Sequence, residues 1–230
     1  MLVAGFPAAM FGTNCYVVAT GPGQECVVVD PGIDVVDQLD QLLAEHHLQP
    51  VAVALTHGHL DHTFSVTPVC GARGIPAYIH SADRDRLADP MATLGPQLTE
   101  MFAGRLTWTE PDDVRELVDH TVLNLAGLDF TIEHAPGHTQ GSVLLSLPAR
   151  GDVPPLCLSG DVLFAGSIGR TDLIGGDFAA MQQSLRTKIL PLADDTVVLP
   201  GHGPQTTIGQ ERATNPYLRE LSQPAPSRGA

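Results

Sequence analysis

Residues 57–62 read His-Gly-His-Leu-Asp-His and place four possible metal ligands within six positions. They come just after Val51–Leu55, a short apolar run with the length and composition of a buried strand. On an extended segment the first two histidines point the same way, and a turn after Leu60 would bring the last two ligands toward a second position. By chance, such a string arises in roughly one chain of this composition in a thousand, so it predicts a metal site at a strand's end.

Three further candidate ligands lie at other junctions between a strand and a loop. His138 stands in Ala-Pro-Gly-His, Asp161 follows Leu-Cys-Leu-Ser-Gly, and His202 follows Val-Val-Leu-Pro-Gly. In each case glycine or proline ends the strand, and loops at the ends of a rigid sheet are where functional side chains collect. Imidazole and carboxylate together suit Zn, Mn or Fe, and imidazole is largely neutral at pH 7. We therefore expect these side chains to complete a binuclear metal site.

Composition and charge exclude several classes of protein. The chain has 230 residues, 43% of them hydrophobic and 17% charged, with a mean hydropathy of +0.08, which excludes a disordered or coiled-coil protein. A net charge of -14 and a pI near 4.9 repel nucleic acids and anionic membrane surfaces. No window of about 18 apolar residues predicts a membrane span, and the N-terminus lacks the basic start of a secretory signal. We expect a cytoplasmic protein with neither nucleic acid nor membrane as a partner.

Strand and helix patterns alternate along both halves of the chain. Two strand-rich halves with interleaved helices predict two sheets packed face to face with helices outside, an α/β (α+β) architecture. The expected strands are Asn14–Ala19, Cys26–Val29, Val51–Leu55, Ile75–Ile79, Val143–Leu147, Leu156–Leu158 and Thr196–Leu199, with a hairpin over Val122–Ile132. The expected helices are Ile33–His47, Ser65–Ala72, one that starts at Ser81, Phe178–Ile189 and Gln210–Leu221.

No linker divides the chain, so we expect a single domain over residues 1–221 and a frayed tail over 222–230, which contains two prolines. Residues 88–112 mix Pro, Gly and large apolar residues; they fit either a satellite of the core or a helix that covers a cleft as a lid. The cysteines form no Cys-x-x-Cys pair, which predicts neither a thiolate metal site nor a disulfide. We expect these four thiols to be buried: Cys15, Cys26, Cys70 and Cys157.

The chain resembles the metallo-β-lactamase superfamily and, within it, the short members of the glyoxalase II (hydroxyacylglutathione hydrolase) group. The resemblance runs from Asn14-Cys15-Tyr16 and Asp30-Pro31-Gly32 to Thr206-Thr207-Ile208-Gly209 and Asn215-Pro216, and the metal pattern is its most specific part. It implies a four-layer αββα sandwich. It also implies one metal held by His57, His59 and His138, a second held by Asp61, His62 and His202, and Asp161 bridging both.

The resemblance implies a metal-dependent hydrolase that cleaves a small-molecule thioester such as S-lactoylglutathione. The expected cofactors are two divalent ions; Zn²⁺ is the leading candidate, and Fe or Mn also suits the ligands. Two ions that share a water lower its pKa from about 15.7 toward 7 and so supply hydroxide at neutral pH. Asp161 would bridge the ions, Asp61 would orient the hydroxide, and one ion would stabilise the growing oxyanion. A leaving thiol with a pKa of about 8.5 needs little help from an acid.

Arg170 is the candidate substrate contact. It lies nine positions after Asp161, where the resemblance to glyoxalase II implies a basic residue that helps to hold glutathione. Asp172 stands where that group often has tyrosine, and its carboxylate would repel an anionic ligand. The alternative role for Arg170 is an ion pair with Asp172 that braces the loop.

Other functions fit parts of the same pattern. Persulfide dioxygenases share the Gly-Arg-Thr-Asp motif of residues 169–172 and use one iron on the equivalents of His57, His138 and Asp161. A lactone or other acyl hydrolase would use the same hydroxide, whereas true β-lactamases of this fold commonly have Cys in place of Asp161. The negative charge argues against a nuclease, and seven filled ligand positions argue against an inactive binding domain. The remaining histidines are expected to lie outside the site: His46, His47, His80, His120 and His134.

Overall fold

The N-terminal half of the chain forms a six-stranded mixed sheet. The computed structural model describes residues 1–90, 100 and 108–222. The sheet runs β1-β2-β3-β4-β5-β6, antiparallel from β1 to β3 and parallel from β3 to β6. Parallel neighbours need crossover connections, and helices α1 (Val36–His46) and α3 (Val66–Arg73) supply two of them. The strands are β1 (Leu2–Pro7), β2 (Asn14–Ala19), β3 (Glu25–Val29), β4 (Gln49–Ala54), β5 (Ala77–Ile79) and β6 (Val114–Glu116).

The C-terminal half forms a second six-stranded sheet, in the order β14-β13-β10-β9-β8-β7. Only β10 and β13 are parallel, and the chain crosses between them through α6 (Phe178–Ser184) and a π-helical turn at Leu185–Ile189. The strands are β7 (Thr121–Leu125), β8 (Leu128–His134), β9 (Val143–Leu147), β10 (Leu156–Gly160), β13 (Val197–Pro200) and β14 (Thr206–Thr207). A separate small hairpin is formed by β11 (Leu163–Phe164) and β12 (Ser167–Ile168).

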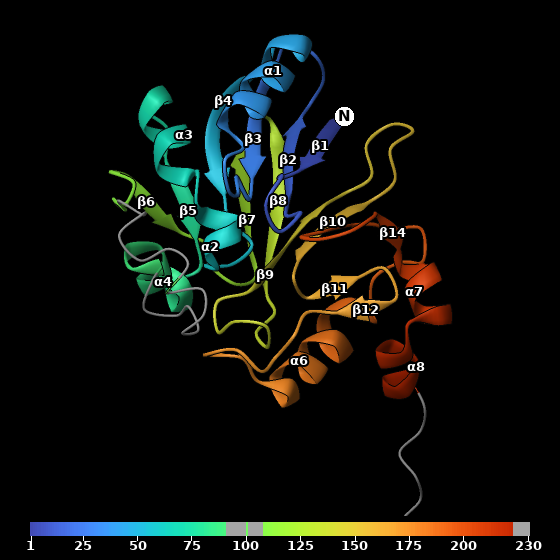
Figure 1. The fold of residues 1–230 in the computed structure, drawn as a ribbon. Helices are drawn as coiled ribbons and strands as arrows, with labels where there is room; N and C mark the ends of the chain where they lie inside the picture. The colour runs from blue at the N-terminus through green and yellow to red at the C-terminus, as the bar shows by residue number, and fades with distance from the viewer. Residues whose placement is uncertain (91–99, 101–107, 223–230) are drawn as a thin grey trace, which may run out of the picture.

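Helices cover the outer face of each sheet. Helices α1, α3 and α4 (Arg84–Ala88) pack on the first sheet. Helices α6, α7 (Ile208–Thr214) and α8 (Pro216–Ser222) pack on the second. In Figure 1 the blue-to-green helices and the orange-to-red helices lie on opposite sides of the strands. The predicted αββα sandwich is therefore confirmed.

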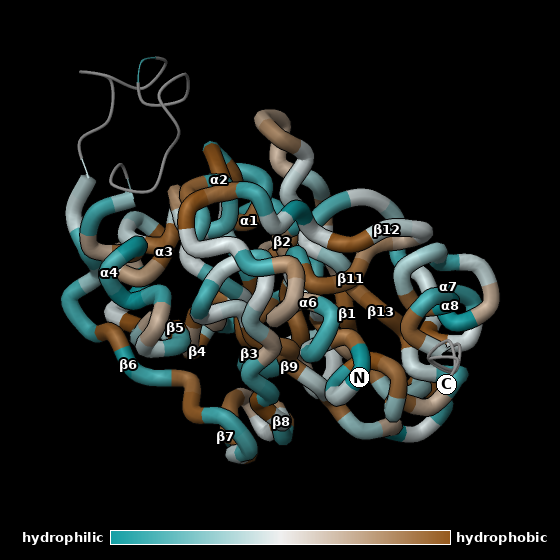
Figure 2. The backbone as a smooth tube through the Cα atoms, turned by 90° about the horizontal axis from the view of Figure 1, so that it is seen from below, coloured by the Kyte–Doolittle hydropathy of each residue, from teal (hydrophilic) through white to brown (hydrophobic). Residues whose placement is uncertain are grey.

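Side chains of the central strands alternate between two cores. In β2, Val17 packs among the helices of the first sheet, whereas Val18 faces the second sheet. From the second sheet, Phe130 and Ile132 of β8 fill the space between the sheets. Because both faces of these strands are buried, their sequences are continuous apolar runs. Figure 2 shows the same contrast, with hydrophobic strand segments inside and more hydrophilic loops around them.

Two predicted helices differ from the structure. The helix expected over Ile33–His47 begins only at Val36, because Asp34 has a φ of 55°, which lies outside the right-handed helical region. The single helix expected over Gln210–Leu221 is wrong. The chain is extended at Asn215, as the residue before a proline tends to be, and α8 begins at the next position. The Asn215 side chain then accepts a hydrogen bond of 3.1 Å from the Tyr217 N–H in the first turn of α8.

Two predicted features, the lid or core satellite over residues 88–112 and the frayed tail over 222–230, fall largely outside the described residues. Most of the segment expected to be a lid or a satellite of the core, 91–99 and 101–107, and the tail from residue 223 lie outside the described residues. At the end of that segment Trp108 packs against the core of the first sheet and donates a hydrogen bond of 2.7 Å to the Leu87 carbonyl.

All four cysteines are buried free thiols, as expected. Among the helices of residues 1–90, 100 and 108–222, none combines the length and apolar character needed to span a bilayer.

Candidate metal centre

Loops at one edge of the sandwich bring together ligands from both sheets. His57 and His59 follow β4 of the first sheet, and Asp61 and His62 lie in α2 (Leu60–Thr63), a single helical turn where we expected a turn after Leu60. The second sheet contributes His138 between β8 and β9, Asp161 directly after β10 and His202 after β13. A hydrogen bond of 2.9 Å from the Val143 N–H to the Thr56 carbonyl joins the two sheets beside these loops.

Three histidines form what we call the first ligand group: His57, His59 and His138. The Nε2 atom of His57 lies 3.2 Å from Nδ1 of His59. That Nδ1 atom is also 2.8 Å from Nε2 of His138. His57 and His138 are buried and His59 is partly exposed, and the three imidazole nitrogens face one another.

The second ligand group consists of Asp61, His62 and His202. Nε2 of His202 lies 3.2 Å from Asp61 Oδ2 and 3.4 Å from Nε2 of His62. Nε2 of His62 is 3.6 Å from the same carboxylate oxygen. The Thr13 hydroxyl donates a hydrogen bond of 2.8 Å to Asp61 Oδ2 and holds the carboxylate in place.

Asp161 lies between the two groups. Its Oδ2 atom is 3.4 Å from Nε2 of His138 in the first group and 3.5 Å from Nε2 of His202 in the second. Its Oδ1 atom is 3.4 Å from Nε2 of His62. Oδ1 is buried, and no residue in the described part of the chain satisfies it with a hydrogen bond. A buried carboxylate with imidazole nitrogens near both of its oxygens, one oxygen lacking a hydrogen bond, is an arrangement that cations would complete.

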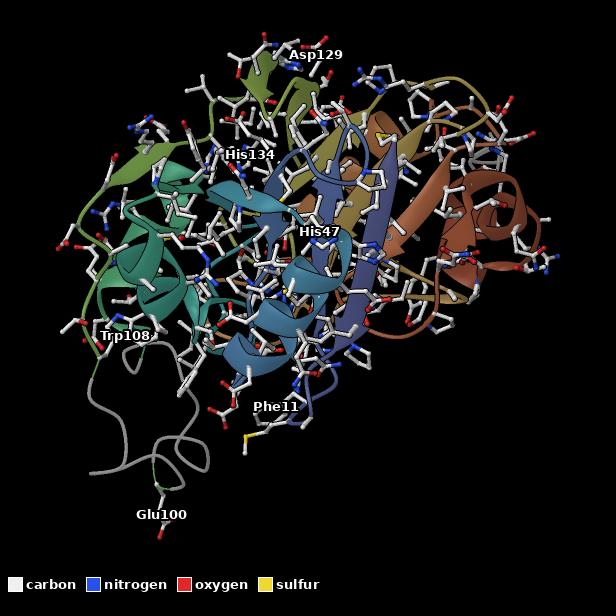
Figure 3. All side chains as sticks on the ribbon, turned by 90° about the horizontal axis from the view of Figure 1, so that it is seen from above. Phe11, His47, Glu100, Trp108, Asp129 and His134 are labelled. Carbon is white, nitrogen blue, oxygen red and sulfur yellow. The ribbon has the colours of Figure 1, made fainter. Side chains whose placement is uncertain are left out.

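Outer hydrogen bonds fix which nitrogen faces the centre in three of the rings, those of His62, His138 and His202. The Nδ1 atom of His62 bonds to Asp30 Oδ2 at 2.9 Å, that of His138 to the Arg170 carbonyl at 2.8 Å, and that of His202 to the Phe11 carbonyl at 3.2 Å. Phe11 lies in the loop that joins the first two strands (Figure 3). Because these oxygens only accept, Nδ1 carries the hydrogen, and in the neutral ring Nε2 turns its lone pair inward. The residues therefore fit metal ions.

His57 is oriented through a relay. Its Nδ1 atom lies 3.2 Å from the Thr56 hydroxyl, and that hydroxyl donates its own hydrogen to Asp30 Oδ2 at 2.6 Å. The hydroxyl is thus left to accept from His57, whose Nε2 lone pair also points inward. Asp30 additionally accepts from the Thr56 N–H at 2.8 Å. One buried carboxylate therefore orients a histidine in each ligand group.

The two groups differ in their affinity for protons. Burial lowers the pKa of all three histidines of the first group, for His59 to about 3. Burial also opposes protonation of His62 and His202, but the carboxylates of Asp61 and Asp161 outweigh it and raise the pKa of both histidines. The same histidines keep the pKa of each carboxyl below its usual range, although burial acts the other way. The carboxylates and the first group are thus in cation-binding forms at neutral pH.

Arg170 is not part of the seven-residue cluster. Its guanidinium, 61% exposed, makes hydrogen bonds of 2.7 and 2.8 Å to the carboxylate of Asp172, the alternative that the sequence left open. Its backbone carbonyl, however, supports His138, a role that sequence patterns did not indicate. The five other histidines lie elsewhere, and two of them, His80 and His134, stack their rings with centroids 4.0 Å apart.

Comparison with known proteins identifies the family of the chain. Residues 9–202 match the family model described as the metallo-beta-lactamase superfamily. The chain belongs to this superfamily. It is accordingly a hydrolase-type enzyme, with a candidate His/Asp centre for one or two metal ions.

Relatives within the superfamily cover nearly the whole chain. A protein of Mycobacterium tuberculosis is 46% identical over 97% of this chain and 100% of its own length. The hydroxyacylglutathione hydrolase GloC of Haemophilus influenzae is 33% identical over 94% of this chain and 97% of its own length.

Two solved structures superpose over 94% of this chain. The BLEG-1 B3 metallo-beta-lactamase has a TM-score of 0.83 and 38% identity, with 99% of its own chain covered. TTHA1623 in a di-iron-bound form has a TM-score of 0.76 and 35% identity, with 100% of its chain covered.

Proposed function

We propose that this chain hydrolyses small-molecule thioesters with two divalent metal ions, Zn²⁺ being the leading candidate. One observation carries the proposal: two groups of inward-facing ligands, one on each side of Asp161, whose buried Oδ1 lacks a donor among the described residues. A site for one ion would need only one of these groups. Similarity to the hydroxyacylglutathione hydrolase GloC supports the choice of a thioester.

The proposed mechanism divides the work between the ions and the chain. When bound, the ions supply a water with a pKa lowered toward about 7 and positive charge for the oxyanion. Asp161 holds the two ligand groups around one point. Asp61, fixed by the Thr13 hydroxyl, is an ionised carboxylate that accepts a hydrogen bond from the attacking water and orients it. The leaving thiol departs as a thiolate with a pKa of about 8.5, so the chain needs no general acid for it.

Arg170 is the residue that we propose to contact the anionic part of a thioester such as S-lactoylglutathione. Its partner Asp172 is exposed, and exposed ion pairs are weak, so a substrate carboxylate can replace Asp172 at little cost. We also propose a cytoplasmic location and a small molecule, rather than nucleic acid or membrane, as the partner.

A second candidate function is β-lactam hydrolysis, because the BLEG-1 B3 metallo-beta-lactamase is 38% identical to this chain. The same centre would act on an amide carbonyl in place of a thioester. The mononuclear-iron dioxygenase is less well supported, because it leaves the second ligand group without a role.

The deciding experiment combines metal analysis with a substrate panel. Purified protein is analysed for Zn, Fe and Mn and assayed with S-lactoylglutathione, a thioester of another thiol, a lactone and a β-lactam, and oxygen uptake is followed with glutathione persulfide. We expect about two ions per chain and the fastest turnover on a thioester. His57→Ala should lose both metal and activity, while His120→Ala, which changes a histidine that is 73% exposed, should lose neither. One iron with oxygen uptake, or faster turnover of the lactam, would refute the thioesterase proposal.

A further inference from the structure

A buried ion pair lies beside the metal centre without contributing a ligand to it. Asp83 ends the 3₁₀ turn Ser81–Asp83, and Arg86 belongs to α4. They are 0% and 6% exposed, and Arg86 Nε lies 3.2 Å from Asp83 Oδ1. Removing two charges from water costs free energy that their mutual attraction seldom returns in full. The other contacts of the pair show what it does.

Asp83 accepts hydrogen bonds from both loops that carry the first ligand group. The Gly58 N–H, between His57 and His59, donates to Oδ2 at 2.8 Å. From the loop of the third histidine, the Thr139 hydroxyl donates to Oδ2 at 2.6 Å and the Gly141 N–H donates to Oδ1 at 2.9 Å. A single carboxylate therefore sets the separation of these loops.

Arg86 extends the link to a third loop. Its Nη2 atom donates a hydrogen bond of 2.6 Å to the Ile174 carbonyl. The loop that contains Ile174 begins near Arg170, whose carbonyl accepts a hydrogen bond from His138 Nδ1. Arg86 Nη1 is buried and finds no acceptor among residues 1–90, 100 and 108–222. Such a donor costs stability, which an ion pair kept only for stability would avoid.

Each of the three loops has a glycine where it passes the pair. A Cβ atom at Gly58 would lie 2.8 Å from Arg86 Cβ and 3.1 Å from Asp83 Cβ. At Gly141 it would lie 2.6 Å from Asp83 Cγ, and at Gly175 it would collide with Arg86 Nη2. Cβ atoms essentially never lie within 3.0 Å of another heavy atom, so the loops fit the ion pair at Gly58 and Gly141 only with glycine. At Gly175 a φ of 84° also favours glycine.

We propose that Asp83 and Arg86 are positioning residues that hold the three histidines of the first ligand group at the spacing needed to share one metal ion. The second ligand group is supported by other residues: Thr13, the Phe11 carbonyl and Asp30, which also orients His57. The inference rests on the metal centre of the proposed function but not on its substrate. Loss of the pair should therefore weaken metal binding by one group only.

The test measures Zn²⁺ affinity in chains that keep one intact group. His202→Ala disables the second group, and His59→Ala disables the first. Metal-free protein of each is titrated with Zn²⁺ against a chromophoric chelator, with and without Asp83→Asn. In the His202→Ala chain we expect Asp83→Asn to weaken binding about 10- to 100-fold, as loss of an outer partner typically does. In the His59→Ala chain we expect less than about a twofold change. Equal weakening in both chains, or none in either, overturns the proposal.

Glu211→Gln is the matched control. Glu211 is a buried carboxylate that likewise accepts from a backbone N–H, a hydroxyl and a side-chain N–H, those of Gly166, Thr206 and Asn215. In the His202→Ala chain this substitution should lower thermal stability but keep the Zn²⁺ affinity. An equal loss of affinity would mean general loosening of the fold and would overturn the positioning role.

A second pair of variants covers the case in which Asp83→Asn does not fold. Thr139→Val removes the hydroxyl that donates to Asp83 and preserves the side chain's shape, whereas Thr139→Ser keeps the hydroxyl. Zn²⁺ affinity of the first group should fall with valine and be retained with serine; equal affinities overturn the proposal. Because no substrate is present, a failure of thioester hydrolysis would leave this result unaffected.

Discussion

Replacing Asp30 by asparagine preserves the shape of the side chain but changes which atoms around the metal centre donate hydrogen bonds and which accept them. The carboxylate accepts from the Thr56 N–H at Oδ1, 2.8 Å away, and from the Thr56 hydroxyl and His62 Nδ1 at Oδ2, 2.6 and 2.9 Å away. An asparagine must put its NH₂ at one of these oxygens, where a donor would face a donor. At the Oδ1 position the NH₂ would face the Thr56 backbone N–H, which can only donate. At the Oδ2 position it would face the Thr56 hydroxyl and His62 Nδ1, and both of these can change from donor to acceptor.

The amide nitrogen is therefore expected at the Oδ2 position, and both partners there must change from hydrogen-bond donor to acceptor. His62 would accept at Nδ1 and carry its hydrogen on Nε2, the atom that faces the centre. The Thr56 hydroxyl would turn to donate toward His57 Nδ1 and impose the same change on His57. Each ligand group then loses one lone pair. We expect metal affinity to fall about 10- to 100-fold, equivalent to about 1.4 to 2.7 kcal/mol per ion.

Two measurements check this expectation. Zn²⁺ titration of metal-free Asp30→Asn gives the loss of affinity, and ¹⁵N NMR of the imidazoles reports which nitrogen of His62 carries hydrogen. Glu211→Gln serves as the control for a buried carboxylate changed to an amide outside the centre. Wild-type affinity for both ions, or a hydrogen still on His62 Nδ1, would refute the reasoning.

Four further predictions concern the centre and its surroundings. Asp161→Ala should lose at least one ion per chain together with activity, since it removes the carboxylate between the groups; an unchanged metal content would contradict the bridging role. Histidines of the second group have a raised pKa and must release protons to bind metal, so dialysis at pH 6 should remove their ion before that of the first group, whose pKa is lowered; metal analysis that shows equal loss would disagree. Arg170→Ala should raise KM for anionic thioesters more than for neutral ones and change kcat little; steady-state kinetics with an equal rise for both would remove it from the substrate site. Gly160→Ala should destabilise the fold by about 1 to 3 kcal/mol, because Gly160 has a φ of 47° and a Cβ there would collide with the Thr56 side chain; an unchanged midpoint in urea would argue against this.

Buried central strands were the most predictable part of the fold. Runs such as Val143–Leu147 are apolar at nearly every position because both faces of the strand are covered, and such runs stand out in a sequence. The outer strand β6 is only three residues long and mostly exposed, so it has no comparable pattern. Helix α2 is a single turn, too short for helical periodicity to show, and the sequence indicated a turn after Leu60 without specifying a helix.

The ligands of the centre could be proposed from the sequence, but their supports could not. Histidines and aspartates that follow glycine or proline at the end of a predicted strand can be recognised from the sequence, because both the residue type and its position suit a metal ligand. Phe11 and Arg170 act through backbone carbonyls, which every residue possesses, so neither has a signal in the sequence. Asp30 and Asp83 accept hydrogen bonds from loops 25 to 58 positions away. Pairing of strands within the first sheet brings Asp30 to Thr56, and packing of the two sheets brings Asp83 to Gly141.

The candidate metal ligands come from both sheets, with four supplied by the segment after β4 and three by loops of the second sheet. An ion held in this way fastens the two halves of the molecule and is released when they separate. At a free concentration about 100 times its Kd, such an ion adds about 2.7 kcal/mol to the stability of the native chain. A cell starved of metal would therefore hold fewer copies of this protein at the same rate of synthesis, because the unloaded molecule opens more often to proteases.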